Sequence, residues 1–173
     1  MEQKPTVFQT GLKYGLILAL ITIGYSLILN LVGLATNRWL PALLGIVFFA
    51  VICYMGHKAF KEGGDGFMSY AQGLGMGVVI ALVSGLLGSI FSVIYIKLID
   101  DSVMEAAMQE QIEKMEDQGM SDAQIDQAME MAAMFQTPVM MVIFGLLWSV
   151  FIGFIISLIV SAITKNSNPE AQV

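Results

Sequence analysis

Four long runs without a charged residue constrain what this chain of 173 residues can fold into. They cover 14–37, 39–56, 66–96 and 136–164. A helix needs about 20 apolar residues to cross a hydrocarbon core about 30 Å thick, so each run is long enough, or nearly so, to span a membrane. Backbone groups in lipid must bond internally, and no run alternates apolar and polar residues as a barrel strand does. The runs therefore predict transmembrane helices.

Composition agrees with this class, because 57% of the residues are hydrophobic, only 13% are charged and the mean hydropathy is +0.76. Such values are too apolar for a soluble domain. We predict an all-α, polytopic membrane protein with one membrane domain over 1–173. Its transmembrane helices are expected at about 12–35, 39–56, 69–98 and 138–163. The first apolar run is too long for a signal peptide core of about 7–15 residues, so we expect a retained anchor.

Two of the runs carry a small residue at every fourth position. On a helix this spacing draws a groove along one face, and in lipid close packing along such grooves is a main source of helix association. We therefore predict that the third and fourth spans pack antiparallel through these small-xxx-small residues. The helix-packing residues are Gly73, Gly77, Ala81, Gly85 and Ser89 in the third span and Gly145, Ser149, Gly153, Ser157 and Ser161 in the fourth.

The segment 100–136 is the only sizeable polar stretch. It holds ten acidic residues and one base, Lys114, giving a net charge of −9 in a chain whose total is −6. Apolar residues at helical spacing predict two amphipathic helices, with Gly119 ending the first and a Ser121–Gln124 capping box opening the second. We expect this helical hairpin to be the interaction element of the protein. Its candidate contact residues are Met104, Met108, Ile112, Met115, Ile125, Met129 and Phe135.

The basic residues predict an orientation. With a cytoplasmic N-terminus, the inner side holds five of them and the outer side holds three, in the direction of the positive-inside rule. The inner set is Lys4, Lys13, Lys58, Lys61 and Lys165, and the outer set is Arg38, Lys97 and Lys114. We expect a bacterial inner-membrane protein with both termini in the cytoplasm and 100–136 in the periplasm.

Several short patterns resemble the uncharacterised bacterial membrane family called domain of unknown function 4199. They are GFMSYAQG at 66–73, YIKLID at 95–100, GMSD at 119–122 and SLI at 157–159. The resemblance covers nearly the whole chain and implies a four-span inner-membrane protein with an acidic periplasmic insertion between the third and fourth spans. It implies no activity. The family pattern has Asp-Pro after the third span, whereas this chain has Asp100-Asp101.

Motifs that could carry chemistry each have a simpler interpretation. The Gly-Gly-Asp-Gly sequence at 63–66 is similar to a phosphate-binding signature of lipid kinases, but only a short loop surrounds it, so we expect a turn. Nine methionines between Met104 and Met141 could bind Cu(I), although methionine also fills apolar helix faces. The single histidine, His57, is expected at the membrane interface, and Cys53 has no disulfide partner. We expect no cofactor and no metal site.

These features favour a non-enzymatic structural, accessory or interaction protein over an enzyme. Its expected partners are the lipid bilayer and either another copy or a different envelope protein, and not nucleic acid, because basic residues are few and scattered. The alternative is a small oligomeric pore or transporter. The uncharged polar residues of the spans could line its path, although hydrogen bonds between helices are their expected role. These residues are Ser26, Asn30, Ser84, Ser92, Ser149 and Ser157.

Overall fold

The computed structural model describes residues 4–35, 37 and 39–168. Arg38, which the orientation argument counted, lies outside the described residues. The described chain forms six helices: α1 (Val7–Leu31), α2 (Leu40–Gly63), α3 (Tyr70–Leu98), α4 (Ser102–Asp117), α5 (Asp122–Phe135) and α6 (Pro138–Thr164). Four of them, α1, α2, α3 and α6, are long and apolar enough to cross a membrane. The predicted all-α fold with four membrane-spanning helices and a helical hairpin is confirmed.

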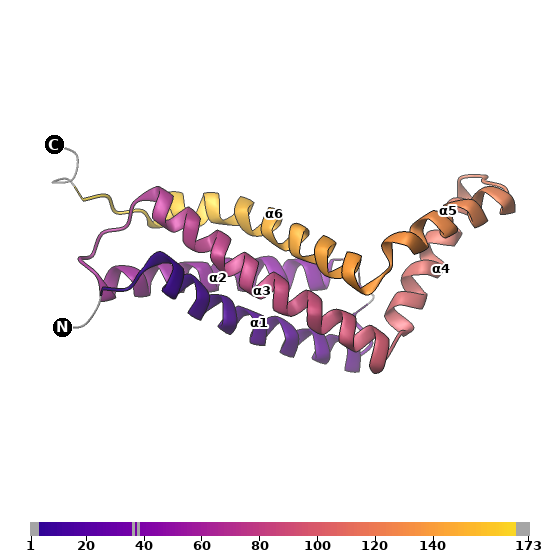
Figure 1. Ribbon diagram of the computed structural model, residues 1–173, viewed down its shortest axis with the longest axis horizontal. Helices are drawn as coiled ribbons and strands as arrows, with labels where there is room; N and C mark the ends of the chain where they lie inside the picture. Colours follow the sequence, from indigo (N-terminus) through magenta and orange to yellow (C-terminus); the bar gives the residue numbers. More distant parts are fainter. Residues whose placement is uncertain (1–3, 36, 38, 169–173) are drawn as a thin grey trace.

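The four long helices form an elongated bundle, and the hairpin of α4 and α5 extends it beyond one end (Figure 1). Both ends of the described chain lie at the opposite end of the bundle (Figure 1). Within the bundle, α3 packs most extensively against α6 and α1, while α2 packs against α1 and α6. The hairpin therefore stands apart from the chain termini along the long axis.

Local hydrogen bonds explain where the helices begin. The Thr6 hydroxyl accepts from the Gln9 amide at 3.1 Å, which starts α1 at Val7, earlier than the predicted residue 12. The same capping box opens α3, where the Ser69 hydroxyl accepts from the Gln72 amide at 3.2 Å. Both sites fit the pattern of Ser or Thr followed three residues later by Gln. A search for apolar runs alone overlooks this signal.

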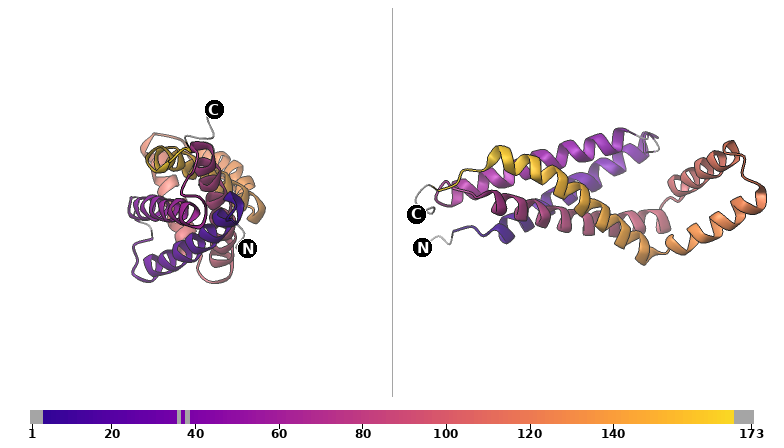
Figure 2. Two further views of the ribbon diagram at one scale, coloured as in Figure 1. Left: turned by 90° about the vertical axis from the view of Figure 1, so that its left-hand side faces the viewer. Right: turned by 90° about the horizontal axis from the view of Figure 1, so that it is seen from above.

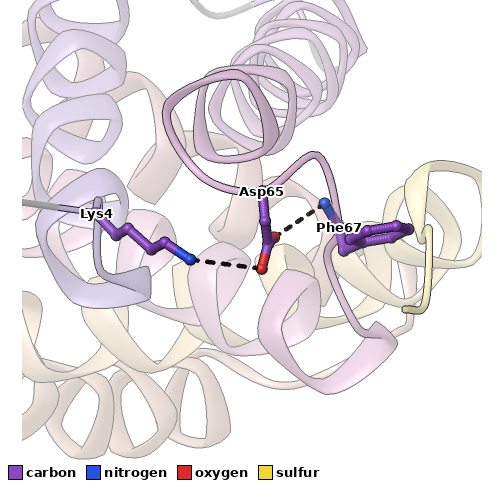
Figure 3. Close-up of polar contacts among 3 residues, drawn as sticks. All are labelled: Lys4, Asp65 and Phe67. Carbon is purple, nitrogen blue, oxygen red and sulfur yellow. Dashed lines mark hydrogen bonds and ion pairs between the residues drawn. The ribbon is translucent and has the colours of Figure 1, made fainter. Parts of the chain in front are cut away.

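Three segments meet at the end of the bundle that holds the chain termini. Lys4 Nζ lies 3.8 Å from the Asp65 carboxylate, which also accepts a hydrogen bond from the Phe67 amide at 3.2 Å (Figure 3). Gly66 has a φ of +83°, so the expected turn at 63–66 is confirmed. Met68 and Asn166 exchange backbone hydrogen bonds of 2.8 and 2.9 Å, which joins the α2–α3 loop to the segment after α6.

The hairpin follows its predicted outline. Gly119 has a φ of +76° and ends the first helix, and the Ser121 amide donates to Gln124 Oε1 at 2.9 Å at the start of the second. At the base of α4, Asp100 Oδ1 accepts from the Ser102 amide at 2.9 Å. Hydrogen bonds from the Ser102 hydroxyl and amide lower the pKa of the Asp100 carboxyl. The ionised Asp100 therefore helps to begin α4.

Toward the hairpin, α1 and α2 diverge from α3 and α6, and we call these the two helix pairs, although α1 packs more extensively against α3 than against α2 over its whole length. In the α1–α2 pair, the Tyr25 and Phe48 rings lie 5.4 Å apart and the Tyr25 hydroxyl donates to the Pro41 carbonyl at 3.4 Å. The second pair is α3 and α6. The right-hand view of Figure 2 shows the hairpin-side ends of α1 and α2 well separated from those of α3 and α6. The main core, which includes Met76 and Ile80, lies in the other half of the bundle.

Candidate functional site

The ten small residues of the third and fourth spans face one another in the structure. We call this set the small-residue seam. Each step of four residues forward along α3 is matched by a step of four backward along α6, so the contacts keep one antiparallel register. The facing pairs are Gly73 with Ser161, Gly77 with Ser157, Ala81 with Gly153, Gly85 with Ser149, and Ser89 with Gly145.

The seam leaves no room for larger side chains. A Cβ atom built on Gly85 would lie 2.5 Å from Ser149 Cβ, and one built on Gly153 would lie 2.5 Å from Ala81 Cβ. One built on Gly77 would collide with the Ser157 hydroxyl. Real Cβ contacts are not this short, so the two backbones approach as closely as they do because one member of each pair is glycine.

The expected hydrogen bonds between helices are made by fewer serines than the sequence suggested. Ser149 Oγ donates across the seam to the Ala81 carbonyl at 3.1 Å. By contrast, Ser26, Ser84 and Ser157 donate to carbonyls of their own helices, as does the Asn30 amide. The expectation is therefore wrong for Ser26, Ser84 and Asn30, whereas Ser157 also bonds between helices, to Cys53 of α2. A helix offers a serine hydroxyl a carbonyl three or four residues back, and that local bond is already formed before helices meet.

A buried polar cluster joins α2, α3 and α6 near the termini. His57 is fully buried, with Nδ1 2.7 Å from the Thr164 hydroxyl, Nε2 3.0 Å from the Gly73 carbonyl, and Nε2 3.5 Å from Cys53 Sγ. We call these four residues the His57 cluster. Lys61 Nζ adds a further tie by donating to the Thr164 carbonyl at 3.0 Å. The cluster connects three helices through one imidazole ring.

The sequence did not predict that His57 is buried between helices, and its expected depth at the membrane interface stays a prediction. The histidine lies four residues after Cys53, so both side chains point from the same face of α2, and this face packs against α3 and α6. Two residues with polar side chains four positions apart on one face of an apolar helix are the signal that could have identified the cluster. Interpreting each residue alone concealed it.

A cavity of about 520 Å³ lies between the two helix pairs, in the hairpin half of the bundle. We call it the interpair crevice. All four spans contribute to its wall, which includes glycines at 45, 85, 88, 145 and 153, and Gly88 has open space around it. A second cavity of about 230 Å³ adjoins it between α1 and α3, and Thr22, Tyr25, Gly88 and Ser92 line both. Of the polar candidates from the sequence, Ser84, Ser92 and Ser149 line the crevice, and Ser26, Asn30 and Ser92 line the second cavity.

The hairpin contact residues predicted from the sequence differ in how far they are buried. Ile125 is buried, and five of the apolar candidates are half-buried along the two helices: Met104, Met108, Ile112, Met115 and Met129. Phe135 is largely exposed, although its ring also meets Phe144 of α6 edge-on, with ring centroids 6.0 Å apart. Met131 and Met134, which the sequence analysis did not select, are exposed beside it. The end of α5 next to the bundle therefore presents an exposed apolar surface, and the acidic residues of α5 lie further from the bundle along the same helix.

Comparison with known proteins identifies the family of this chain but assigns it no activity. Residues 13–166 match the model of a family described as "Protein of unknown function (DUF4199)", which confirms the resemblance noted in the sequence. Searches of curated proteins and of solved structures found no match.

Proposed function

This chain belongs to the DUF4199 family of proteins of unknown function. From its geometry we propose a non-enzymatic membrane protein that binds a partner through its hairpin. The observation that carries the proposal is the contrast between the two parts of the molecule. The seam packs α3 and α6 together with little free space, and these two helices hold the two ends of a hairpin that otherwise stands clear of the bundle (Figure 1).

The chemistry of the hairpin favours a basic partner with an apolar contact area. The segment 100–136 has a net charge of −9, which repels both the hairpin of a second copy and the anionic head groups of a bilayer. Opposite charge would speed association with a positively charged protein surface. The exposed Met131, Met134 and Phe135 would then be covered by that surface. We propose another protein of the bacterial envelope as the partner, with the hairpin in the periplasm.

Site-specific photo-crosslinking in the cells that express this protein tests the proposal. A photoreactive phenylalanine analogue at Met131 or Met134 is expected to give one discrete adduct with a different protein. The same analogue at lipid-exposed Leu43 is the matched control and is expected to give no such adduct. Reversing charge with Asp122→Lys, Asp126→Lys and Glu130→Lys is expected to abolish the adduct, because the partner surface is basic.

Three results would contradict this proposal: no adduct from α5, adducts only with another copy of the chain, or an adduct that charge reversal leaves unchanged. The rival idea of an oligomeric pore has weaker support. The hydroxyls of Thr22, Ser84 and Ser149 in the crevice wall donate to backbone carbonyls, so they offer a passing anion or a hydrogen-bond-accepting solute few free donors.

A further inference from the structure

The interpair crevice carries an inference that does not depend on the role of the hairpin. Its wall combines apolar side chains from both helix pairs, such as Leu18 and Phe49 on one side and Ile152 and Ile156 on the other. None of the residues that line it in the described chain carries a formal charge. The crevice is therefore an apolar recess among the four spans.

The polar groups in the wall do not change this character. Thr22 donates to the Ala19 carbonyl at 3.0 Å, Ser84 to the Ile80 carbonyl at 2.7 Å and Ser149 to the Ala81 carbonyl at 3.1 Å. Each of these hydroxyl hydrogens is thus already bonded to the backbone. What the three side chains add to the crevice is mainly their carbon surface, which favours a hydrocarbon occupant over a polar one.

The crevice lies among helices whose outer faces are apolar. Every wall belongs to a helix long and apolar enough to cross a membrane, and exposed apolar side chains stand at the wall on both sides, with Ile46 on α2 and Trp148 on α6. At that depth a bilayer supplies acyl chains rather than water. An occupant can enter sideways from the lipid without crossing a polar barrier.

The volume decides between an acyl chain and a helix of a second copy. A helix with its side chains is about 10–12 Å across and rises about 1.5 Å per residue. A space of about 520 Å³ therefore accommodates roughly one turn of such a helix, far less than a span. It lies within the range of about 300–1,000 Å³ typical of small-molecule sites. A thin, flexible chain matches this space better than a second helix does.

We propose that the interpair crevice binds an acyl chain of a bilayer phospholipid, held between the α1–α2 pair and the α3–α6 pair. The chain fills space that Gly88 leaves open and lies against Phe49 and Ile156 at its inner end. It occupies the gap where the two pairs part (Figure 2). Bound lipid is thus a component of the folded bundle in this half of the membrane.

Photolabelling from within the bilayer tests this site. The full-length protein is reconstituted into vesicles of phosphatidylethanolamine and phosphatidylglycerol with a trace of phosphatidylcholine that carries a diazirine on one acyl chain. Phe49 and Ile156 are only 7% and 9% exposed, so label on them reports a chain inside the crevice. Label on the exposed side chains of Leu43 and Ile159 reports ordinary lipid contact and serves as the internal reference.

Two variants fill the crevice and one control does not. Gly88 lines both cavities and an added Cβ would meet no atom within 4 Å, so Gly88→Leu is chosen to fill the crevice. Ser92→Leu fills the same region from an exposed position and covers the case in which the first variant fails to fold. Gly24 also has open space around it but lines neither cavity, which makes Gly24→Leu the matched control.

We expect label on Phe49 and Ile156 in the wild type and in Gly24→Leu, and its loss to background in Gly88→Leu and Ser92→Leu, while Leu43 and Ile159 remain labelled. Absence of label on Phe49 and Ile156 in the wild type overturns the proposal, as does label that both filling variants leave unchanged. Reaction of Gly45→Cys with a charged, membrane-impermeant thiol reagent also overturns it, because the crevice would then be hydrated.

Discussion

At the residue scale, His57 has a defined hydrogen-bonding role. The Gly73 carbonyl can only accept, so Nε2 carries the proton that it donates there. Nδ1 then accepts from the Thr164 hydroxyl at 2.7 Å, for which the Val160 carbonyl, 2.8 Å away, is a second acceptor within the same helix. The neutral ring thereby satisfies groups from α3 and α6 at once. In a low-dielectric interior each of these bonds is costly to lose, because no water replaces it.

The first prediction concerns Thr164. Thr164→Val keeps the shape of the side chain but removes the donor to His57 Nδ1, so the free energy of unfolding should fall by about 1–3 kcal/mol. Unfolding in mixed detergent micelles measures this change. Thr22→Val is the matched control, because the Thr22 hydroxyl bonds only within its own helix, and it should leave stability nearly unchanged. Equal stability of the two variants would contradict the role assigned to His57.

The seam and the His57 cluster differ in how far the sequence reveals them. A spacing of four residues places the small residues on one helix face whatever surrounds it, so the face could be identified in advance. The burial of His57 depends on which side of α2 meets α3 and α6. That choice is made by contacts between helices far apart in the chain, and the sequence of α2 alone does not contain it.

At the element scale, the fixed register of the seam makes α3 and α6 one unit. Glycine costs roughly 1 kcal/mol relative to alanine inside a helix, so helix propensity alone disfavours the seam glycines. Close approach of the two backbones offsets this cost only if the opposing residue is also small. We therefore expect the two members of each facing pair to depend on one another.

Gly77 and Ser157 test this dependence. Gly77→Ala places a methyl group against the Ser157 hydroxyl, and overpacking should lower the free energy of unfolding by about 1–3 kcal/mol. Adding Ser157→Gly removes the collision and should restore much of the loss. Gly24→Ala, where no neighbour lies within 4 Å, should be neutral or slightly stabilising. If Ser157→Gly gave no rescue in a double-mutant cycle, the two residues would not be coupled.

Helix existence was predictable at this scale, whereas helix limits were less so. Long apolar runs identified all four spans, and amphipathic spacing with Gly119 identified both hairpin helices. The starts of α1 and α3 depend on side-chain caps at Thr6 and Ser69, which lie outside the apolar runs or near their edges. α2 continues past the apolar run to Gly63. In this last part Lys58 and Glu62 form an ion pair of 3.7 Å across one helical turn, which is compatible with a helix outside the apolar run.

At the scale of the whole molecule, α2, α3 and α6 meet at the His57 cluster, and the two helix pairs part toward the hairpin (Figure 2). The interpair crevice results from the angle between the pairs. Its wall residues come from all four spans, and no local pattern fixes that angle. The crevice therefore could not be predicted from the sequence, although several of the polar residues that line it had been selected as candidates.

The arrangement also predicts how the chain crosses the membrane. Gln118 lies in the turn between α4 and α5, and Ser167 follows α6. Figure 1 shows that turn and the end of α6 at opposite ends of the molecule. In a Cys53→Ser background, an impermeant thiol reagent applied to intact cells with a permeable outer membrane should label Gln118→Cys. Ser167→Cys should react only after the inner membrane is opened. Labelling of both from the same side would exclude the four-span topology, and the reverse pattern would exclude a periplasmic hairpin.

The seam also has a consequence for biogenesis. α3 leaves the ribosome well before α6, because the whole hairpin is synthesised between them. At about 5–20 residues per second, its groove of small residues waits several seconds for its partner helix. During that interval α1 already covers another face of α3, while the groove itself is open to lipid or to the membrane insertion machinery. α6, the last of the described helices to be made, is thus the one that completes the seam.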